Sequence, residues 1–171
     1  MLKFTGIVGL VAALGLIGIL KAEELKSRVK DLEDFLRMCL FLKSKINYLR
    51  EPLTYAYSTG NSGSGNRADL LLHEVFVEID EKQGEIEEIW AQKADEIYKT
   101  SRLTKADMNY IRYPGKFIGQ TDYENQLYQF EYIQSSLENQ IKEADEELKR
   151  KGPLYRKLGF FAGALIVIII F

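Results

Sequence analysis

The chain has two uncharged, strongly apolar ends and a charged region between them. Phe4–Leu20 and Leu158–Phe171 contain no charged side chain, and nearly every charged residue lies between Lys21 and Lys157. In that middle region apolar residues recur every three or four positions, which is the spacing of one face of an α-helix. The pattern therefore predicts an all-α protein with two exceptional ends.

The middle region is predicted to form an antiparallel bundle of about six helices. The first helix covers Glu23–Leu49, and Pro52 stops it because the residue before a proline avoids the helical conformation. Its expected apolar face consists of Leu25, Val29, Leu32, Leu36, Cys39 or Leu40, Ile46 and Leu49. Further helices are expected over Leu53–Ser58, Asp69–Asp80 and Glu85–Thr100 and from Thr104 onwards, with breaks at the Gly/Ser-rich stretch Thr59–Asn66 and at Gly84.

The helix that begins after Thr104 has its own start and stop signals. Thr104 can supply an N-cap oxygen, and Asp107 places an acid in the first turn. We expect this helix to end near Pro114-Gly115 or at Gly119.

The longest helix of the middle region is expected after Thr121. Thr121 and Glu124 have the spacing of a capping box, in which each side chain bonds to the backbone amide of the other residue. The apolar face that follows consists of Leu127, Phe130, Ile133 or Gln134, Leu137, Ile141, Ala144 and Leu148. A glycine–proline pair at Gly152-Pro153 predicts the end of this helix.

The N-terminal uncharged segment is predicted to be an uncleaved membrane anchor. As a helix, Phe4–Leu20 would be about 25 Å long, which is just enough for a hydrocarbon core of about 30 Å. Lys3 and Lys21 can extend to the two edges of the membrane. The alternative is a signal peptide, but Leu20 and Lys21 before Ala22 make a poor cleavage site.

The C-terminal uncharged segment is predicted to be a second membrane helix. Leu158–Phe171 would be about 21 Å long, a length that a buried helix of a soluble core can also have. A core helix usually keeps a polar stripe, and this segment has none. Tyr155, Arg156 and Lys157 can lengthen it as residues of the membrane–water interface.

Basic residues flank both apolar segments on the side of the middle region. Lys21, Lys26, Arg28 and Lys30 follow the first segment, and Lys149, Arg150, Lys151, Arg156 and Lys157 precede the second. Because such residues stay on the cytoplasmic side, the middle region should be cytoplasmic. We therefore expect an N-terminal anchor over residues 1–21, a cytosolic helical bundle over 22–156 and a C-terminal membrane helix over 157–171.

The sequence offers no set of residues for catalysis or metal binding. His73 is the only histidine, so neither a histidine-based metal site nor a catalytic triad can be assembled around it. Cys39 is the only cysteine, which excludes an internal disulfide and suits a reducing compartment. A net charge of −2 gives no basis for nucleic-acid binding. We expect no enzyme activity, no cofactor, no metal and no small-molecule substrate.

Two groups of residues are candidates for docking a protein partner. The first is an acidic zone that includes Glu78, Glu85, Glu87 and Glu88 and would attract a basic surface. Solvated helix faces are the alternative interpretation of this zone. The second is a group of tyrosines, a residue type enriched at interfaces, at Tyr110, Tyr113 and Tyr128. Core packing of the bundle explains these tyrosines equally well.

Small residues in the two apolar ends are candidates for close helix packing. Gly159 and Gly163 form a G-x-x-x-G pattern, and Gly9 and Ala13 continue a similar ridge from Thr5. Such ridges let two helices approach closely within a membrane. The two segments could pair with each other or with another membrane subunit.

Taken together, this arrangement resembles the stage III sporulation protein AB family of endospore-forming bacteria. The resemblance covers nearly the whole chain, and its last part is the most specific. It is carried by Asn47-Tyr48-Leu49 with Pro52-Leu53, by Trp90, by Gly119-Gln-Thr-Asp122 with Gln126, and by Tyr155-Arg-Lys-Leu-Gly159 with Gly163. The chain departs from the family pattern at Thr59–Asn66 and at Arg112–Lys116, where a simpler helix end is expected.

The resemblance implies a role in the machinery that links mother cell and forespore. Proteins of this family sit in the membrane on the mother-cell side, around the forespore. Their cytosolic domain is similar to that of the inner-membrane platform proteins of type II secretion and type IV pilus systems, which meet a secretion-type ATPase. The expected function is a non-enzymatic scaffold that docks such an ATPase or other channel subunits. The alternative is a membrane-tethered coiled-coil adaptor unrelated to secretion.

Overall fold

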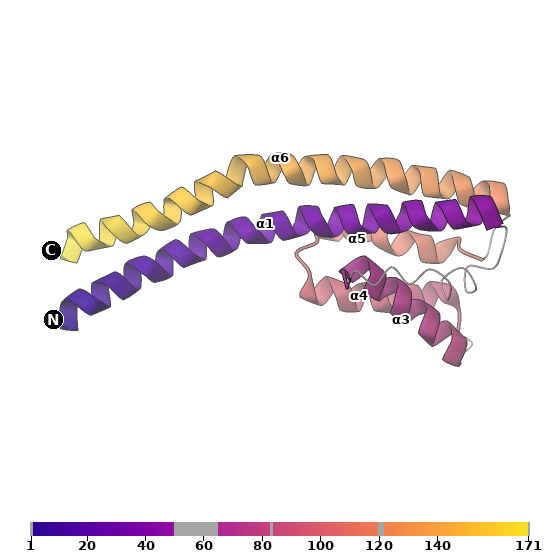
Figure 1. The fold of residues 1–171 in the computed structure, drawn as a ribbon, viewed down its shortest axis with the longest axis horizontal. Helices are drawn as coiled ribbons and strands as arrows, with labels where there is room; N and C mark the ends of the chain where they lie inside the picture. The colour runs from indigo at the N-terminus through magenta and orange to yellow at the C-terminus, as the bar shows by residue number, and fades with distance from the viewer. Residues whose placement is uncertain (1, 50–64, 83, 120–121, 171) are drawn as a thin grey trace. The chain divides into compact units, whose positions relative to one another are not determined.

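The computed structural model of the chain is built from helices and short connections over the residues that it describes. These are residues 2–49, 65–82, 84–119 and 122–170, with side chains described at 9, 11–46, 65–81, 84–119 and 122–167. The elements are α1 (Leu2–Leu49), α3 (Arg67–Lys82), α4 (Ile86–Thr100), α5 (Lys105–Arg112), the 3-10 helix η1 (Tyr113–Lys116) and α6 (Tyr123–Ile170) (Figure 1). The prediction of an all-α fold is confirmed. The helix expected over Leu53–Ser58 lies outside the described residues.

Both apolar ends are continuous with helices of the middle region. α1 and α6 each have 48 residues, so each predicted membrane segment and the adjoining predicted bundle helix form one helix (Figure 1). The predicted end of the last helix at Gly152-Pro153 is wrong, because α6 runs through Pro153. A proline inside a helix removes one backbone hydrogen bond and favours a kink, but it does not prevent continuation. Here the turns that follow are held by packing on α1 at Gly159.

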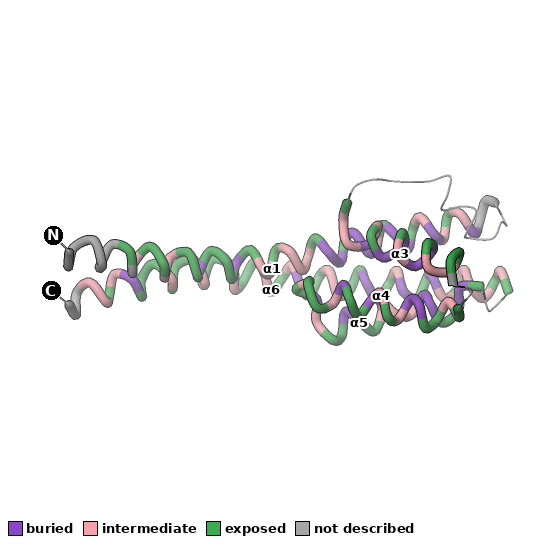
Figure 2. The backbone as a smooth tube through the Cα atoms, turned by 90° about the horizontal axis from the view of Figure 1, so that it is seen from below, coloured by how far each residue is buried: buried purple, intermediate pink, exposed green. Residues whose placement is uncertain are grey.

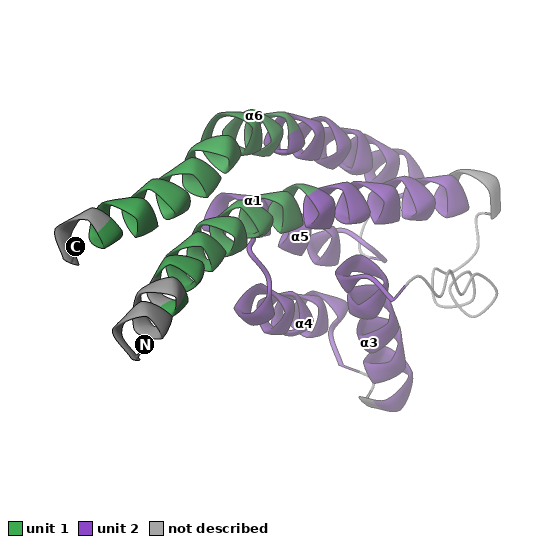
Figure 3. Ribbon diagram, turned by 60° about the vertical axis from the view of Figure 1, so that its left-hand side comes forward, with its two compact units in different colours: residues 1–29, 142–171 green, residues 30–141 purple. Residues whose placement is uncertain are grey.

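The helices belong to two compact units. Unit 1 comprises Met1–Val29 with Lys142–Phe171, and unit 2 comprises Lys30–Ile141 (Figure 3). Unit 1 therefore contains the two apolar ends, and unit 2 contains α3, α4, α5 and η1 together with parts of α1 and α6. The limits expected at residues 21/22 and 156/157 rest on where charge begins and ends in the sequence, and they stay a prediction.

The core of unit 2 surrounds Trp90 of α4, which is fully buried. Its indole Nε1 donates a hydrogen bond of 2.8 Å to the carbonyl oxygen of Ile111 on α5. In η1, a Cβ at Gly115 would lie 2.7 Å from the Cβ of Trp90, so only glycine lets this turn approach the ring. The other large buried side chains include Leu32, Phe35, Leu42, Leu71, Met108, Ile111, Ile118, Phe130, Ile133 and Leu137. Figure 2 colours the buried parts of the backbone purple.

The apolar faces expected in α1 and α6 are confirmed with a small shift. Leu32, Cys39 and Ile46 of α1 are buried as predicted, but Phe35 takes the buried place expected for Leu36, which is half-buried. On α6 the predicted core residues Phe130, Ile133, Leu137 and Ala144 are buried.

The start of α5 follows the predicted pattern. The hydroxyl oxygen of Thr104 accepts the amide of Asp107 at 3.2 Å, and the Asp107 carboxylate accepts the amide of Thr104 at 2.7 Å. The prediction of a cap at this position is therefore confirmed. The predicted capping box of Thr121 and Glu124 includes Thr121, which lies outside the described residues. Next to it, Asp122 Oδ1 accepts the amide of Asn125 at 2.9 Å in the first turn of α6.

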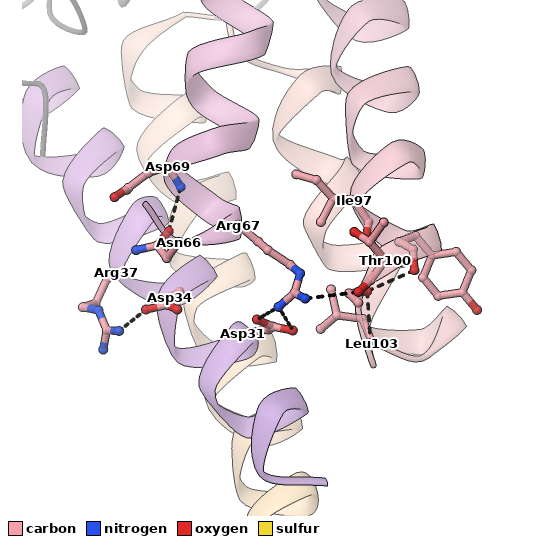
Figure 4. A network of polar contacts seen from close by, with 11 residues as sticks. Asp31, Asp34, Arg37, Asn66, Arg67, Asp69, Ile97, Thr100 and Leu103 are labelled. Atoms are coloured by element: carbon pink, nitrogen blue, oxygen red, sulfur yellow. Dashed lines mark hydrogen bonds and ion pairs between the residues drawn. The ribbon is translucent and has the colours of Figure 1, made fainter. Parts of the chain in front are cut away.

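A polar network ties α1 to α3 and to the end of α4. Asn66 Oδ1 caps α3 by accepting the amide of Asp69 at 2.8 Å. Next to this cap, Arg67 Nη1 donates to both carboxylate oxygens of Asp31, at 2.8 and 3.1 Å, and Nη2 donates to the carbonyl oxygen of Thr100 at 3.1 Å (Figure 4). The Asp31 side chain is only 5% exposed. Burial raises the pKa of Asp31 above the usual 3.8, although the bond from Arg67 opposes that shift.

The two partners of this ion pair should respond unequally to substitution. Arg67→Met leaves a buried carboxylate without its counter-charge, so we expect a loss of about 3 kcal/mol of stability. Asp31→Asn keeps an oxygen that accepts from Arg67, and we expect a loss below about 1 kcal/mol. Urea unfolding of the full chain, followed by the fluorescence of the only tryptophan, Trp90, measures both values. Equal losses in the two variants would contradict this assignment.

The pH dependence supplies an independent check. A carboxyl pKa that is raised in the folded state gives stability that is present below pH 3.8 and is lost as pH rises through the raised pKa. The cost of Arg67→Met should therefore shrink as pH falls through that window. In the double variant Asp31→Asn/Arg67→Met this dependence should disappear.

Candidate functional site

In unit 1 the backbones of α1 and α6 meet at glycines. A Cβ at Gly159 would lie 2.7 Å from the carbonyl oxygen of Leu14, and a Cβ at Gly18 would collide with the carbonyl oxygen of Tyr155. At Gly163, a Cβ would lie 3.0 Å from the side-chain Cγ1 of Val11 and 3.2 Å from its Cα. No larger side chain fits at Gly18 or Gly159 without separating the helices. We call this contact of Gly18, Gly159 and Gly163 the glycine seam.

The glycine seam uses only part of the predicted set of small residues. Gly159 and Gly163 lie in it, whereas Gly9 would have no neighbour within 4 Å of its Cβ and Ala13 is exposed. The partner glycine, Gly18, was missing from the sequence-based candidates. One sequence signal could have indicated it: each of the two glycines lies within three residues of a lysine at the edge of an apolar end, Gly18 near Lys21 and Gly159 near Lys157. If both lysines lie at the same membrane–water interface, the two glycines lie at the same depth and can face each other.

Large apolar side chains cover the outside of the described part of unit 1. No larger side chain fits at Gly18 or Gly159, and these exposed side chains lie away from the seam. Phe160 is 67% exposed and Phe161 is 64% exposed. Other exposed apolar residues of this unit are Leu16, Ile17, Ile19, Leu20, Leu154, Leu158 and Leu165. Within the described residues, no helix has a stretch that is both long and apolar enough to span a membrane.

Ion pairs neutralise several of the basic residues next to these apolar ends. Lys21 pairs with Glu24 at 2.8 Å, and Lys26 pairs with Glu23 at 3.3 Å. Across the two helices, Arg28 of α1 donates to Glu147 of α6 at 3.1 Å. Lys149 pairs with Asp145 at 2.5 Å, and Lys151 pairs with Glu147 at 2.6 Å. The hydrogen bond from Lys151 is the main reason why the pKa of Glu147 is lowered.

The acidic candidates of unit 2 fall into two groups. Glu78 is paired with Lys93 at 3.0 Å, and its side chain is only 13% exposed. This hydrogen bond is the main cause of the raised pKa of Lys93, which also lies near Glu74 and Glu96. Glu78 therefore joins α3 to α4 inside the unit. Glu85, Glu87 and Glu88 are exposed at the start of α4.

The tyrosine candidates also separate into packed and exposed residues. Tyr110 and Tyr113 are half-buried, and their rings lie 6.4 and 5.9 Å from the ring of Tyr132. The hydroxyl of Tyr113 donates to Gln129 Oε1 at 2.9 Å. These contacts account for both residues as packing between α6 and the α5–η1 segment. Tyr128 is 69% exposed and is the candidate most accessible to a partner.

The remaining candidates for chemistry lie on different helices. His73 is exposed on α3, whereas Cys39 is buried on α1, and burial raises the pKa of its thiol to about 12. Such a thiol is unreactive at neutral pH. Across the described residues, no cluster of three or more histidine, cysteine or acidic side chains could hold a metal ion.

Comparison with known proteins gives one family and one fold. A family model described as stage III sporulation protein AB matches residues 3–171. The chain is also similar to a solved structure of stage III sporulation protein AB (SpoIIIAB), with a TM-score of 0.64 and 17% identity. That similarity covers 71% of this chain and 96% of the other. No curated protein matches the chain.

Widening the glycine seam should separate the ends of α1 and α6. Gly18→Leu with Gly159→Leu places two side chains where the backbones touch, so we expect the distance between the helices to increase by several ångströms. Gly15→Leu is the matched control, because a Cβ at Gly15 meets nothing within 4 Å. Spin labels at the exposed positions Leu16 and Leu165 measure the distance by pulsed EPR, while Cys39 is too deeply buried to compete for label. An unchanged distance in the double variant would contradict the seam.

Proposed function

Because the chain belongs to the stage III sporulation protein AB family, we propose that it is a membrane scaffold without enzymatic activity in the assembly that links mother cell and forespore. Both apolar ends insert into one membrane, and the helices of unit 2 recruit cytosolic partners. The observation that carries this proposal is the apolar outer surface of unit 1. A family model that covers residues 3–171 supports the sporulation role, and assembly with other sporulation proteins follows from that role.

Exposed apolar area favours lipid over water as the surroundings of unit 1. Burying one Leu or Phe side chain is worth about 1.5–3 kcal/mol. Leu16, Leu20, Phe160 and Phe161 are each more than half exposed, so together they contribute several kcal/mol on transfer to lipid. Contiguous exposed apolar surface of this kind marks membrane or protein contact sites.

The glycine seam supports insertion of both ends into the same membrane. α1 and α6 run antiparallel there, since Gly163 lies opposite Val11 and Gly159 opposite Leu14 and Gly18. Two antiparallel helices in contact place their basic flanks, near Lys21 and Lys157, on the same side. By the preference of basic residues, that side is the cytoplasm, which here is the mother-cell cytoplasm around the forespore.

The partner surface that we propose lies on unit 2. Glu85, Glu87 and Glu88 are exposed acids at the start of α4, and Tyr128 offers an exposed aromatic ring on α6. Acidic residues at an interface steer a basic partner and fix its orientation. A secretion-type ATPase or another subunit of the assembly is the partner class that we propose.

The alternative function, a coiled-coil adaptor, has less support. Such an adaptor needs an apolar face of α6 that is open to a partner helix. Phe130, Ile133 and Leu137, which form that face in unit 2, are fully buried within the chain. A partner helix would have to displace this core.

Extraction of native membranes tests the anchoring. We expect the full-length chain to remain in the pellet after washing with alkaline carbonate, and tags at both termini to resist protease added from the cytoplasmic side. A chain that is released by carbonate, or that has lost its first two dozen residues, would overturn the membrane scaffold.

Charge reversal tests the docking surface. Glu85→Lys, Glu87→Lys and Glu88→Lys together should weaken recruitment of a secretion-type ATPase to membranes that contain the full chain, by about tenfold or more at low salt. The matched control reverses three exposed acids elsewhere, Glu33, Glu138 and Glu143. Co-sedimentation of the ATPase with proteoliposomes measures recruitment, and circular dichroism verifies the helix content. Equal binding by both triple variants would contradict docking at the start of α4 and would show that these acids are only a solvated helix face.

A further inference from the structure

We propose that Arg156, Lys157, Phe160 and Phe161 of α6 form a binding site for an anionic phospholipid. The two cations would hold the headgroup phosphate, and the two rings would contact the first part of an acyl chain. This inference rests on the membrane insertion proposed above, and it adds the chemical class of the ligand and the residues that bind it.

The four residues share one face of α6. They line a common hollow, with Arg156 one turn before Phe160 and Lys157 one turn before Phe161. At 100° per residue, Phe160 and Phe161 lie about 100° and about 200° around the helix from Gly159. Counted in the same way, Arg156 and Lys157 lie about 60° and about 160° from Gly159, so the hollow extends from beside the glycine seam to the opposite side of α6. All four side chains are exposed.

Charge pairing sets these two cations apart from most of their neighbours. Lys149 and Lys151 each pair with an acid four residues earlier, and Arg28 pairs with Glu147. Glu147 is the last acidic residue of the sequence. Over the part of the chain that the structure describes, neither Arg156 nor Lys157 forms an ion pair. Both cations are therefore available to an anion from outside the described chain.

The combination of charge and exposed rings favours a lipid. Free phosphate would satisfy the cations but would leave Phe160 and Phe161 in water. An anionic phospholipid supplies a phosphate and an apolar chain in the order in which the helix presents cations and rings. A zwitterionic lipid carries its own ammonium group, which competes for the phosphate. Each cation near an anionic membrane surface favours binding by about fivefold.

Lipid selectivity measured by EPR tests the site. The full-length chain is reconstituted into phosphatidylcholine vesicles with a trace of spin-labelled phosphatidylglycerol or spin-labelled phosphatidylcholine. We expect the native chain to immobilise phosphatidylglycerol at least several-fold more strongly. Arg156→Gln with Lys157→Gln should bring this preference close to one. Lys149→Gln with Lys151→Gln, on the same helix and with the same loss of charge, should retain most of it.

The outcomes separate this site from its rivals. No preference in the native chain, or an unchanged preference in Arg156→Gln/Lys157→Gln, would overturn the proposal. Loss of the preference on adding millimolar glycerol phosphate would assign the cations to a free phosphate. Chain-to-chain cross-linking that is lost in the variant without a change in lipid preference would assign the hollow to a protein contact. Carbonate extraction of the same vesicles distinguishes two failures. A chain that stays in the pellet but shows no lipid preference lacks the site, whereas a released chain was never inserted.

Discussion

The approach of two backbones at Gly18 and Gly159 is the contact on which the organisation of unit 1 depends. Because no larger side chain fits at these two positions, the large exposed side chains described in unit 1 lie beside the seam or outside it. The seam therefore fixes two properties at once. It pairs the ends of α1 and α6 in antiparallel directions, and it turns Phe160, Phe161 and Leu165 outward. Unit 2 is arranged in the opposite way, because Phe35, Trp90 and Phe130 are buried in its interior and its polar faces lie outside.

Charged residues also divide into those that form ion pairs within the chain and those that stay exposed on its surface. Lys93 holds Glu78 within unit 2, and Arg67 holds Asp31, so these acids and bases serve the fold. In unit 1 the pairs near Glu147 do the same for α1 and α6. Among the charges that stay exposed are the acids at the start of α4 and the bases Arg156 and Lys157 on α6. A chain with a net charge of only −2 thus carries an exposed acidic group on unit 2 and an exposed basic group on unit 1.

Much of the fold could be predicted from local patterns. The three- and four-residue spacing identified the buried faces of α1 and α6, and the Thr104–Asp107 cap identified the start of α5, since both signals act within one or two turns. The end predicted at Gly152-Pro153 was wrong because a local breaker was outweighed by packing farther along the helix. Gly18 and the Glu78–Lys93 pair were missed for a related reason. Each depends on which residue of another helix lies opposite, and spacing along one helix does not contain that information.

The acids at the start of α4 carry a structural role beside the docking role that we propose. Glu87 and Glu88 lie in the first turn, where a negative charge stabilises the helix by about 0.3–1 kcal/mol. Glu85 is the N-cap residue, and its side chain forms no capping bond. A cation placed in that turn opposes the helix dipole, so charge reversal there removes an attraction and also loosens the helix start. Neutral glutamine removes the attraction with a smaller effect on the helix. A graded loss of binding from glutamate to glutamine to lysine, without loss of helix content, is the signature of recognition by charge.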